Sequence, residues 1–321
     1  MKTKKPDIFL GITICMLVLA AALCIAILVI QKNADKKPTP VTPGTPGSTT
    51  EAVVDSGATG NQTDTGATGS TDAPSPVQPA DLKAIDEAGL KAKLDAAIKG
   101  LTSEWQVMVT DPIKGTQVTS AVNCEVGDWM TANRMAQVFI MGAAYQQVAD
   151  GKLTEEAIQE DLTAMITKND TYAADRLTDL VGGREAVKSF AVDNGLKLGF
   201  NRPITGSSDK KNYVSAQQTA LLLDLICRGE LVSKEASAKM LNLLLTPNDQ
   251  LAIDPGLTGD NVRYGFITDI EDGTCVCAMG VVQLPHRSFV ISVVCNEPVT
   301  TDGAKAKITE LISATQPFFA E

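Results

Sequence analysis

The chain has 321 residues, of which 44% are hydrophobic and only 4% aromatic, and it carries a formal net charge of -10 at pH 7. Acidic residues and lysines balance within residues 1–80, so the whole negative excess lies in residues 81–321. Nucleic-acid binding depends largely on neutralising phosphates with basic side chains. The composition therefore argues against nucleic acid as a partner, and it leaves room for one large domain after the non-globular segments are removed.

The N-terminal segment predicts a membrane anchor. Residues 8–30 form an uncharged apolar run, long enough to span a hydrocarbon layer of roughly 30 Å at about 1.5 Å per residue. A cleaved signal peptide has a shorter apolar core followed by small residues, whereas Gln31, Lys32 and Asn33 follow here. We expect a short cytoplasmic tail over residues 1–7 and a single-pass transmembrane signal anchor over residues 8–30.

The next segment predicts a tether. Residues 31–80 are rich in Thr, Ser, Pro and Gly and lack apolar periodicity, which is typical of a disordered linker. Lysines flank the apolar run equally on both sides and do not decide its orientation. A short tail before the anchor and a long tether after it favour a domain displayed outside the cell. We therefore expect residues 81–321 to lie outside the cytoplasm, at the cell membrane.

The first half of the domain alternates between helix and strand patterns. An amphipathic helix is predicted over residues 84–101, and alternating apolar residues around the turn at Asp111-Pro112 predict a hairpin. The run Trp129–Asp150 then contains the most apolar helix outside the N-terminus, and its lack of a polar face predicts burial from several sides. Further helices are predicted over residues 154–167, 171–181 and 184–194.

The second half closes the sheet. A polar loop over residues 195–213 is long enough to indicate a functional or mobile segment. Two helices with serine caps follow, and then three strands and a last helix. Their order predicts an α+β fold with one five-stranded antiparallel sheet, flanking helices and an inserted all-helical subdomain. The helices are expected at 215–228, 233–245 and 304–315, and the strands at 262–270, 274–284 and 288–296.

Three segments carry a family resemblance: QVFIMGAAYQQVADGKL, MITKNDTYAADRLTDLVGG and NYVSAQQTALLLDLICRGELVSKEASAKML. They resemble the class A β-lactamases and penicillin-binding serine hydrolases, and the resemblance extends over essentially all of residues 81–321. It implies a β-lactamase-like α/β (α+β) fold. The active site of that family combines S-x-x-K at the start of the buried helix, S-D-N on a loop of the helical subdomain and K-T-G on a strand.

None of these motifs is present where the resemblance places it. Arg134 replaces the serine of S-x-x-K, and Gln137 replaces the lysine. Acyl transfer requires a hydroxyl or thiol activated by a neighbouring base, and neither side chain supplies one. We expect Arg134 to pair with Asp170 or another carboxylate, because a partly buried unpaired guanidinium is costly. The other two motifs fall on Asn169-Asp170-Thr171, where Asp170 has a helix-capping role as its alternative, and on Phe266-Ile267-Thr268, where an aromatic ring replaces the cation.

Two other hydroxyls are alternative nucleophiles. Thr131 has Arg134 three residues later, but a protonated arginine cannot act as a general base, and we expect Thr131 to be the N-cap of the buried helix. Ser208 and Lys211 form a literal S-x-x-K, but they lie in a polar loop rather than at the start of a buried helix. The same loop has no counterpart of the glutamate that deacylates class A enzymes.

Neither a metal nor a cofactor is expected. The sole histidine, His286, falls in a predicted hairpin turn, which argues against a Ser-His-Asp triad or a multi-histidine metal site. No glycine-rich phosphate loop follows a predicted strand. Cys275 and Cys277 share one face of a strand and Cys295 lies on the next strand, so a cross-strand disulfide and simple burial are alternative hypotheses. The five cysteines of the domain are Cys124, Cys227, Cys275, Cys277 and Cys295.

The leading functional hypothesis is a pseudoenzyme that has lost acyl-serine chemistry and serves as a binding or scaffolding module for peptidoglycan or an envelope protein. The alternative is an active serine hydrolase that uses Thr131 or Ser208 on a β-lactam or a peptidoglycan-related amide or ester. A third hypothesis is a domain that only spaces or anchors an assembly. A cleft filled by side chains such as Arg134 and Phe266 would favour spacing, and an open cleft would favour ligand binding.

Overall fold

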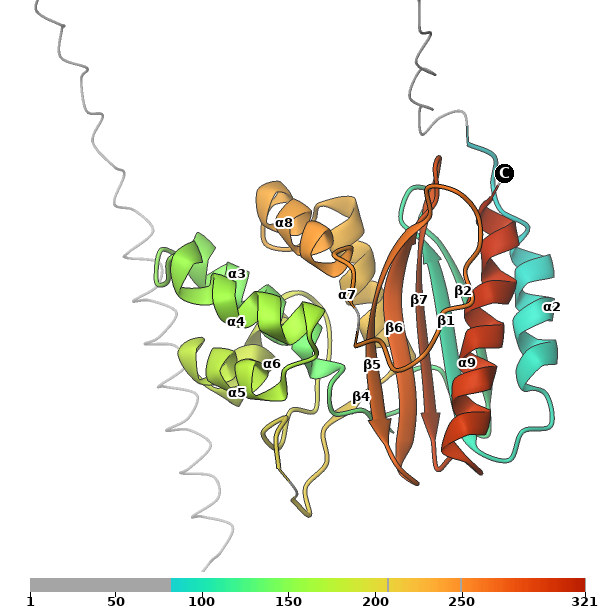
Figure 1. The fold of residues 1–321 in the computed structure, drawn as a ribbon, viewed down its shortest axis with the longest axis horizontal. Helices are drawn as coiled ribbons and strands as arrows, with labels where there is room; N and C mark the ends of the chain where they lie inside the picture. Colours follow the sequence, from blue (N-terminus) through green and yellow to red (C-terminus); the bar gives the residue numbers. More distant parts are fainter. Residues whose placement is uncertain (1–81, 207, 249, 321) are drawn as a thin grey trace, which may run out of the picture. The chain divides into compact units, whose positions relative to one another are not determined.

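The centre of the domain is a five-stranded antiparallel sheet with the strand order β2-β1-β7-β6-β5 (Figure 1). Strand β1, from the start of the domain, pairs along its length with β7, from near its end. The expected sheet, in which both ends of the domain meet, is thereby confirmed. The strands are β1 (Glu104–Asp111), β2 (Thr116–Val122), β5 (Arg263–Glu271), β6 (Cys275–Gln283) and β7 (Ser288–Asn296).

The computed structural model describes residues 82–206, 208–248 and 250–320. The tail, anchor and linker predicted for residues 1–80 lie outside this part of the chain. Within it, no helix is long and apolar enough to cross a membrane.

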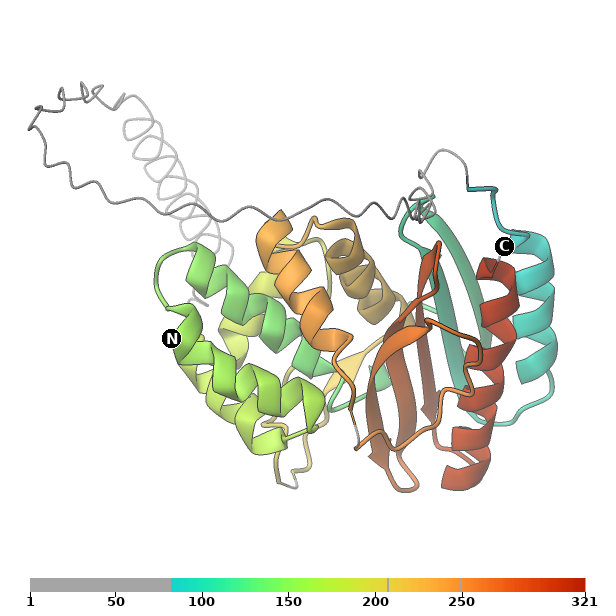
Figure 2. The ribbon, with the colours of Figure 1, turned by 45° about the horizontal axis from the view of Figure 1, so that its top comes forward.

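The two terminal helices cover one face of the sheet (Figures 1 and 2). Helix α2 (Glu87–Ile98) directs Leu90, Leu94 and Ile98 inward, which is the helical spacing that the sequence predicts. Helix α9 (Thr301–Thr315) contributes Ile308 and Leu311 to the same apolar core, and the short turn η1 (Gln316–Phe319) follows it.

The other face carries the helical subdomain, which confirms the predicted insertion (Figure 2). Two very short strands, β3 and β4, pair with each other at the junction between the sheet and this subdomain, and no pattern in the sequence predicted them. The elements are β3 (Met130–Thr131), α3 (Ala136–Ala149), α4 (Glu155–Thr167), α5 (Thr171–Leu180), α6 (Arg184–Asp193), β4 (Tyr213–Val214), α7 (Ala216–Arg228) and α8 (Lys234–Leu244).

Helix α3 is buried on all sides over most of its length, as its composition predicts. Every residue from Ala136 to Tyr145 is buried. Gly142 lets α6 approach closely, because a Cβ at this position would lie 2.5 Å from the ring of Phe190. Helix α3 is therefore enclosed by the other helices of the subdomain.

The cross-strand disulfide hypothesis is wrong. In the β6–β7 ladder Cys295 lies opposite Val276, not opposite Cys275 or Cys277. Side chains alternate between the two faces of a sheet, so Cys295 points toward α2 and α9 while Cys275 and Cys277 point toward the helical subdomain. All five cysteines of the described domain are free thiols.

A buried ion pair connects the end of β1 with the residue before β7. Arg287, just before β7, donates from Nε to Asp111 Oδ2 at 3.1 Å and from Nη1 to the carbonyl of Lys83 at 2.8 Å. Both charged side chains are almost fully buried, and the guanidinium also lies 5.4 Å from the ring centre of Phe319.

Removing one partner of this pair should destabilise the domain strongly. We expect Arg287→Met to lower the free energy of unfolding by about 3–5 kcal/mol, because Asp111 would remain buried without a counter-charge. Urea unfolding followed by circular dichroism measures this, and the double variant Asp111→Leu/Arg287→Met should recover part of the loss. A single variant with unchanged stability would contradict the assignment.

Candidate functional site

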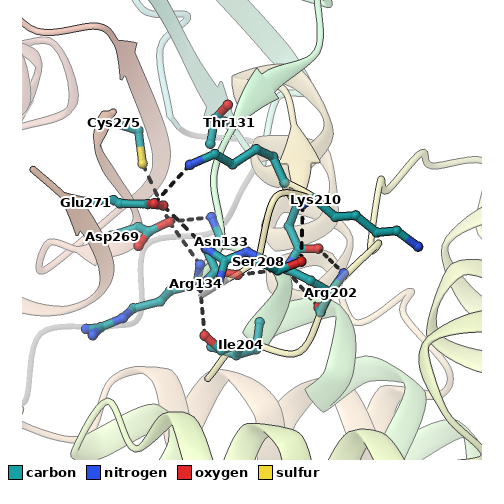
Figure 3. Close-up of polar contacts among 12 residues, drawn as sticks. Thr131, Asn133, Arg134, Arg202, Ile204, Ser208, Lys210, Asp269, Glu271 and Cys275 are labelled. Atoms are coloured by element: carbon teal, nitrogen blue, oxygen red, sulfur yellow. Dashed lines mark hydrogen bonds and ion pairs between the residues drawn. The ribbon is translucent and has the colours of Figure 1, made fainter. Parts of the chain in front are cut away.

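The first turn before α3 is capped by a carboxylate from the sheet. Asp269 Oδ2, on β5, accepts hydrogen bonds from the backbone N–H groups of Asn133 at 2.5 Å and Arg134 at 2.9 Å (Figure 3). The N-cap role expected for Thr131 is wrong, because Thr131 lies in β3 and α3 has no side-chain cap of its own. The N–H groups of the turn that leads into α3 are thus satisfied by a residue 136 and 135 positions away in the chain.

Burial shapes the chemistry of this carboxylate. Asp269 is 2% exposed. Burial raises its pKa above the ordinary value of 3.8, while the hydrogen bond from Arg134, the positive charge of Arg134 and the hydrogen bond from Asn133 act in the opposite direction. The helix end supplies positive potential that favours an anion here.

Strand alternation decides which β5 residues reach this region. Ile267 packs in the core beneath the helical subdomain, whereas Phe266 packs in the core beneath α2 and α9. Asp269 and Glu271 share the parity of Ile267 and face the subdomain side. Phe266 therefore does not stand at the site, and two acidic residues that the sequence analysis did not select do so instead.

These elements enclose an open polar pocket of about 530 Å³. Its walls come from the start of α3, the start of α5, the loop before β4 and the end of β5. Arg134, Thr171 and Ser208 line it, together with Asp269 and Glu271. Neither Phe266 nor Asp170 lines this pocket.

The loop before β4 forms one wall of this pocket and is held in place by hydrogen bonds. Asp175 accepts from the backbone N–H groups of Ile204 at 2.7 Å and Thr205 at 3.0 Å. Asn133 donates from Nδ2 to the carbonyl of Ile204 at 2.9 Å and accepts from Asn212 Nδ2 at 2.7 Å. Buried amides thus tie the loop to the turn before α3.

Glu271 organises two of the cations in the pocket. Arg202 Nη2 lies 3.4 Å from Glu271 Oε2 (Figure 3). Lys211 Nζ lies 3.0 Å from Glu271 Oε1. Arg202 is 6% exposed and also donates from Nη1 to the carbonyl of Gly206 at 2.7 Å, while its Nε has no hydrogen-bond partner in the described chain. The acidic pair at alternate positions of FITDIE, on an otherwise apolar strand, is the sequence signal that would have found Asp269 and Glu271.

Arg134 has no ionic partner, which makes the expected ion pair wrong. No carboxylate of the described residues lies within ion-pair distance of its guanidinium, and Figure 3 shows the side chain extending away from Asp269 and Glu271. Arg134 is partly exposed, so water can solvate its guanidinium, and the carboxylate partner that we expected is not required.

The residues in place of S-D-N have structural roles. Asp170 caps α5 through the backbone N–H groups of Tyr172 at 2.8 Å and Ala173 at 3.1 Å, in line with the capping interpretation. Asn169 adopts a positive φ of 54°, and its Oδ1 is buried without a partner in the described chain. Of the three, Thr171 reaches the pocket lining.

The alternative nucleophiles lack an adjacent base. Ser208 is exposed, and its Oγ accepts from the backbone N–H of Lys210 at 3.2 Å, while Lys211 is engaged by Glu271. Thr131 pairs through its backbone with Tyr213 of β4. Among the described residues, no group of three or more His, Cys, Asp or Glu side chains is placed to hold a metal ion.

The family model described as the beta-lactamase enzyme family matches residues 156–315, from α4 to the end of α9. The chain belongs to this β-lactamase family. The match begins after α3, so it does not include Arg134 or Gln137. No curated protein matches the chain in sequence.

Solved structures share the fold of this β-lactamase-family domain. A β-lactamase from Sphaerobacter thermophilus has a TM-score of 0.61 and 20% identity, covering 73% of this chain and 98% of that chain. TLA-1 extended-spectrum β-lactamase has a TM-score of 0.64 and 16% identity, covering 73% and 99%. A β-lactamase from Xanthomonas campestris has a TM-score of 0.61 and 13% identity, covering 72% and 98%.

Gln137, in the position of the family lysine, is isolated in the core. It is completely buried, and neither its Oε1 nor its Nε2 has a hydrogen-bond partner in the described chain. A buried amide without partners carries an uncompensated desolvation cost. In this structure Gln137 therefore does not act on the pocket.

Substitutions at Gln137 test this assignment. We expect Gln137→Met to raise the free energy of unfolding by about 1–3 kcal/mol, because the side-chain volume is kept and the unpaired amide is removed. Gln137→Lys should lower it, since an ammonium would be buried without a counter-charge. Urea unfolding of both variants measures the difference, and a destabilised Gln137→Met would mean that the amide has a partner.

Proposed function

We propose that this β-lactamase-family domain is a pseudoenzyme that binds a ligand at the cell envelope without hydrolysing it, on a chain anchored in the membrane by residues 8–30. One observation carries the proposal: the carboxylate of Asp269 occupies the backbone N–H groups of Asn133 and Arg134.

The occupied N–H groups matter because acyl transfer develops negative charge on an oxygen. Enzymes stabilise that charge with hydrogen-bond donors that are free to receive it, often backbone N–H groups beside the nucleophile. At the start of α3 the donors already hold a carboxylate, whose charge opposes a second anion. The nucleophile and base positions are also lost, because Arg134 and Gln137 provide neither a hydroxyl nor a proton acceptor.

The state of the pocket supports binding over a purely spacing role. Its volume of about 530 Å³ lies within the range of roughly 300–1,000 Å³ that is usual for small-molecule sites. Phe266 packs elsewhere and Arg134 lines the pocket without filling it. Peptidoglycan or an envelope protein is the partner class that suits a tethered domain outside the cytoplasm.

Covalent labelling tests the loss of chemistry. The full-length chain, purified in detergent and incubated with a fluorescent penicillin, should show no mass increase in intact-protein mass spectrometry and no turnover of a chromogenic cephalosporin. An active class A β-lactamase in the same detergent is the positive control.

An adduct would overturn the proposal and support the alternative of an active serine hydrolase. The variants Ser208→Ala and Thr131→Val then identify the nucleophile, because only loss of the reacting hydroxyl abolishes labelling. A reactive fluorophosphonate extends the test to hydrolases that do not react with β-lactams, and the expected result is again no adduct.

A further inference from the structure

We propose that the pocket binds a small organic monoanion that carries one carboxylate and one planar ring, with the carboxylate on the Arg134 guanidinium and the ring against Tyr172. This inference rests on the proposed function of binding without hydrolysis, and it names a small-molecule ligand for the pocket that is separate from a peptidoglycan or protein partner of the domain. It places the anchoring charge of the ligand at the position where the family carries its nucleophile.

The first step is the unpaired charge of Arg134. Arg134 is partly exposed and lines the pocket, and no carboxylate of the described residues lies within ion-pair distance of its guanidinium. A guanidinium offers a planar fork of donors that matches the two oxygens of a carboxylate, and such paired hydrogen bonds are among the strongest in proteins. The hydrogen bond from its own backbone N–H to Asp269 holds the backbone of Arg134 in place.

The second step is the charge balance of the lining. Three cations, Arg134, Arg202 and Lys211, face two carboxylates, Asp269 and Glu271. The pocket thus has an excess of one positive charge in a domain that is negative as a whole. Glu271 engages Arg202 and Lys211, which leaves Arg134 to meet the ligand. The second negative charge of a dianion, such as a phosphate ester, would be repelled by the carboxylates of Asp269 and Glu271. The charge of the lining therefore favours a monoanion.

The third step is an unsatisfied donor in the same lining. Arg202 is nine-tenths buried, and its Nε has no partner in the described chain. An orphaned charged donor in a pocket wall is costly unless a ligand or water accepts from it. Because Nε is itself buried, it adds to the positive potential of the pocket wall and is not a direct contact for the ligand.

The fourth step is the exposed ring of Tyr172. Its side chain is 70% exposed although it lines the pocket, while its backbone is fixed at the start of α5 by Asp170. Aromatic rings gain about 0.5–1.5 kcal/mol from offset or edge contacts beyond simple burial, so an exposed ring at a pocket wall favours a ligand with a ring of its own.

Fluorine NMR on the full-length chain in detergent tests the proposal. The probe is 4-fluorophenylacetate, and the two comparison compounds are its neutral amide, 4-fluorophenylacetamide, and the dianion 4-fluorophenyl phosphate. We expect saturable line broadening with the carboxylate and at least about tenfold weaker binding for the other two compounds. Equal binding of the amide or tighter binding of the phosphate overturns the proposal, as does the absence of binding by the carboxylate.

Variants locate the contact. Arg134→Gln should weaken binding of 4-fluorophenylacetate by about 10- to 100-fold, and Tyr172→Ala by about 2- to 10-fold. Arg176→Gln is the matched control: this exposed arginine on α5 pairs with Asp161 at 3.1 Å and does not line the pocket. Thermal unfolding checks that each variant is folded, and Tyr172→Ala, at an exposed position, keeps the test valid if Arg134→Gln does not fold.

Two results separate the two proposals. Reversible binding that is unchanged in Arg134→Gln overturns the ligand assignment and leaves the pseudoenzyme proposal intact. A covalent adduct with penicillin overturns the pseudoenzyme proposal. Mass spectrometry detects this adduct, whereas reversible binding is measured by the NMR line width, so the two results are distinguishable.

Discussion

The hydrogen bonds from Asn133 and Arg134 to Asp269 are the constraint on which the candidate site depends. They join the edge of the sheet to the most deeply buried helix of the domain, and they do so with a charged group that is itself 2% exposed. A buried carboxylate is costly unless donors and positive potential meet it, and the start of α3 supplies both. Under the proposed function, the same contact also occupies backbone donors that an acyl-transfer enzyme would keep free for developing charge.

Once this contact is fixed, the arrangement of the surrounding groups follows. Asn133 directs its side chain into the loop before β4 and orders it, so that the loop becomes a wall. Glu271 lies two residues beyond Asp269 on the same side of β5, and it forms ion pairs with Lys211 and Arg202 of the loop. The backbone of Arg134 is held by one carboxylate and its side chain has no carboxylate partner among the described residues, and it is the group that we propose a ligand meets.

Local patterns predicted the framework well, because helices and strands depend on short-range periodicity. The helix with Leu90 and Leu94, the buried run of α3 and the five-stranded sheet all lie where apolar spacing places them. The family resemblance was confirmed as well.

The errors concern contacts that depend on register or on distant residues. Thr131 is the nearest cap in the sequence, but the group that caps the turn arrives from 136 positions away. Neighbouring strands alone left a disulfide to Cys295 open, but the register sets Cys295 opposite Val276 and on the other face, so of the two hypotheses burial holds. The same parity places Phe266 in the far core and brings Asp269 to the site. No single-sequence pattern fixes these registers, which depend on how β5, β6 and β7 pair.

The most direct test of the account is the NMR titration of the Asn133 and Arg134 amide protons. Because burial raises the Asp269 pKa above 3.8, both signals should shift together as the pH falls through that raised pKa, and Asp269→Asn should abolish the titration. Protonation there also favours the folded state, since the native pKa exceeds the unfolded one. Asp170→Asn, which removes the carboxylate that caps α5, should leave both signals unchanged. If the amide signals of Asn133 and Arg134 titrated in the same way in Asp269→Asn as in the unchanged chain, the result would contradict this contact.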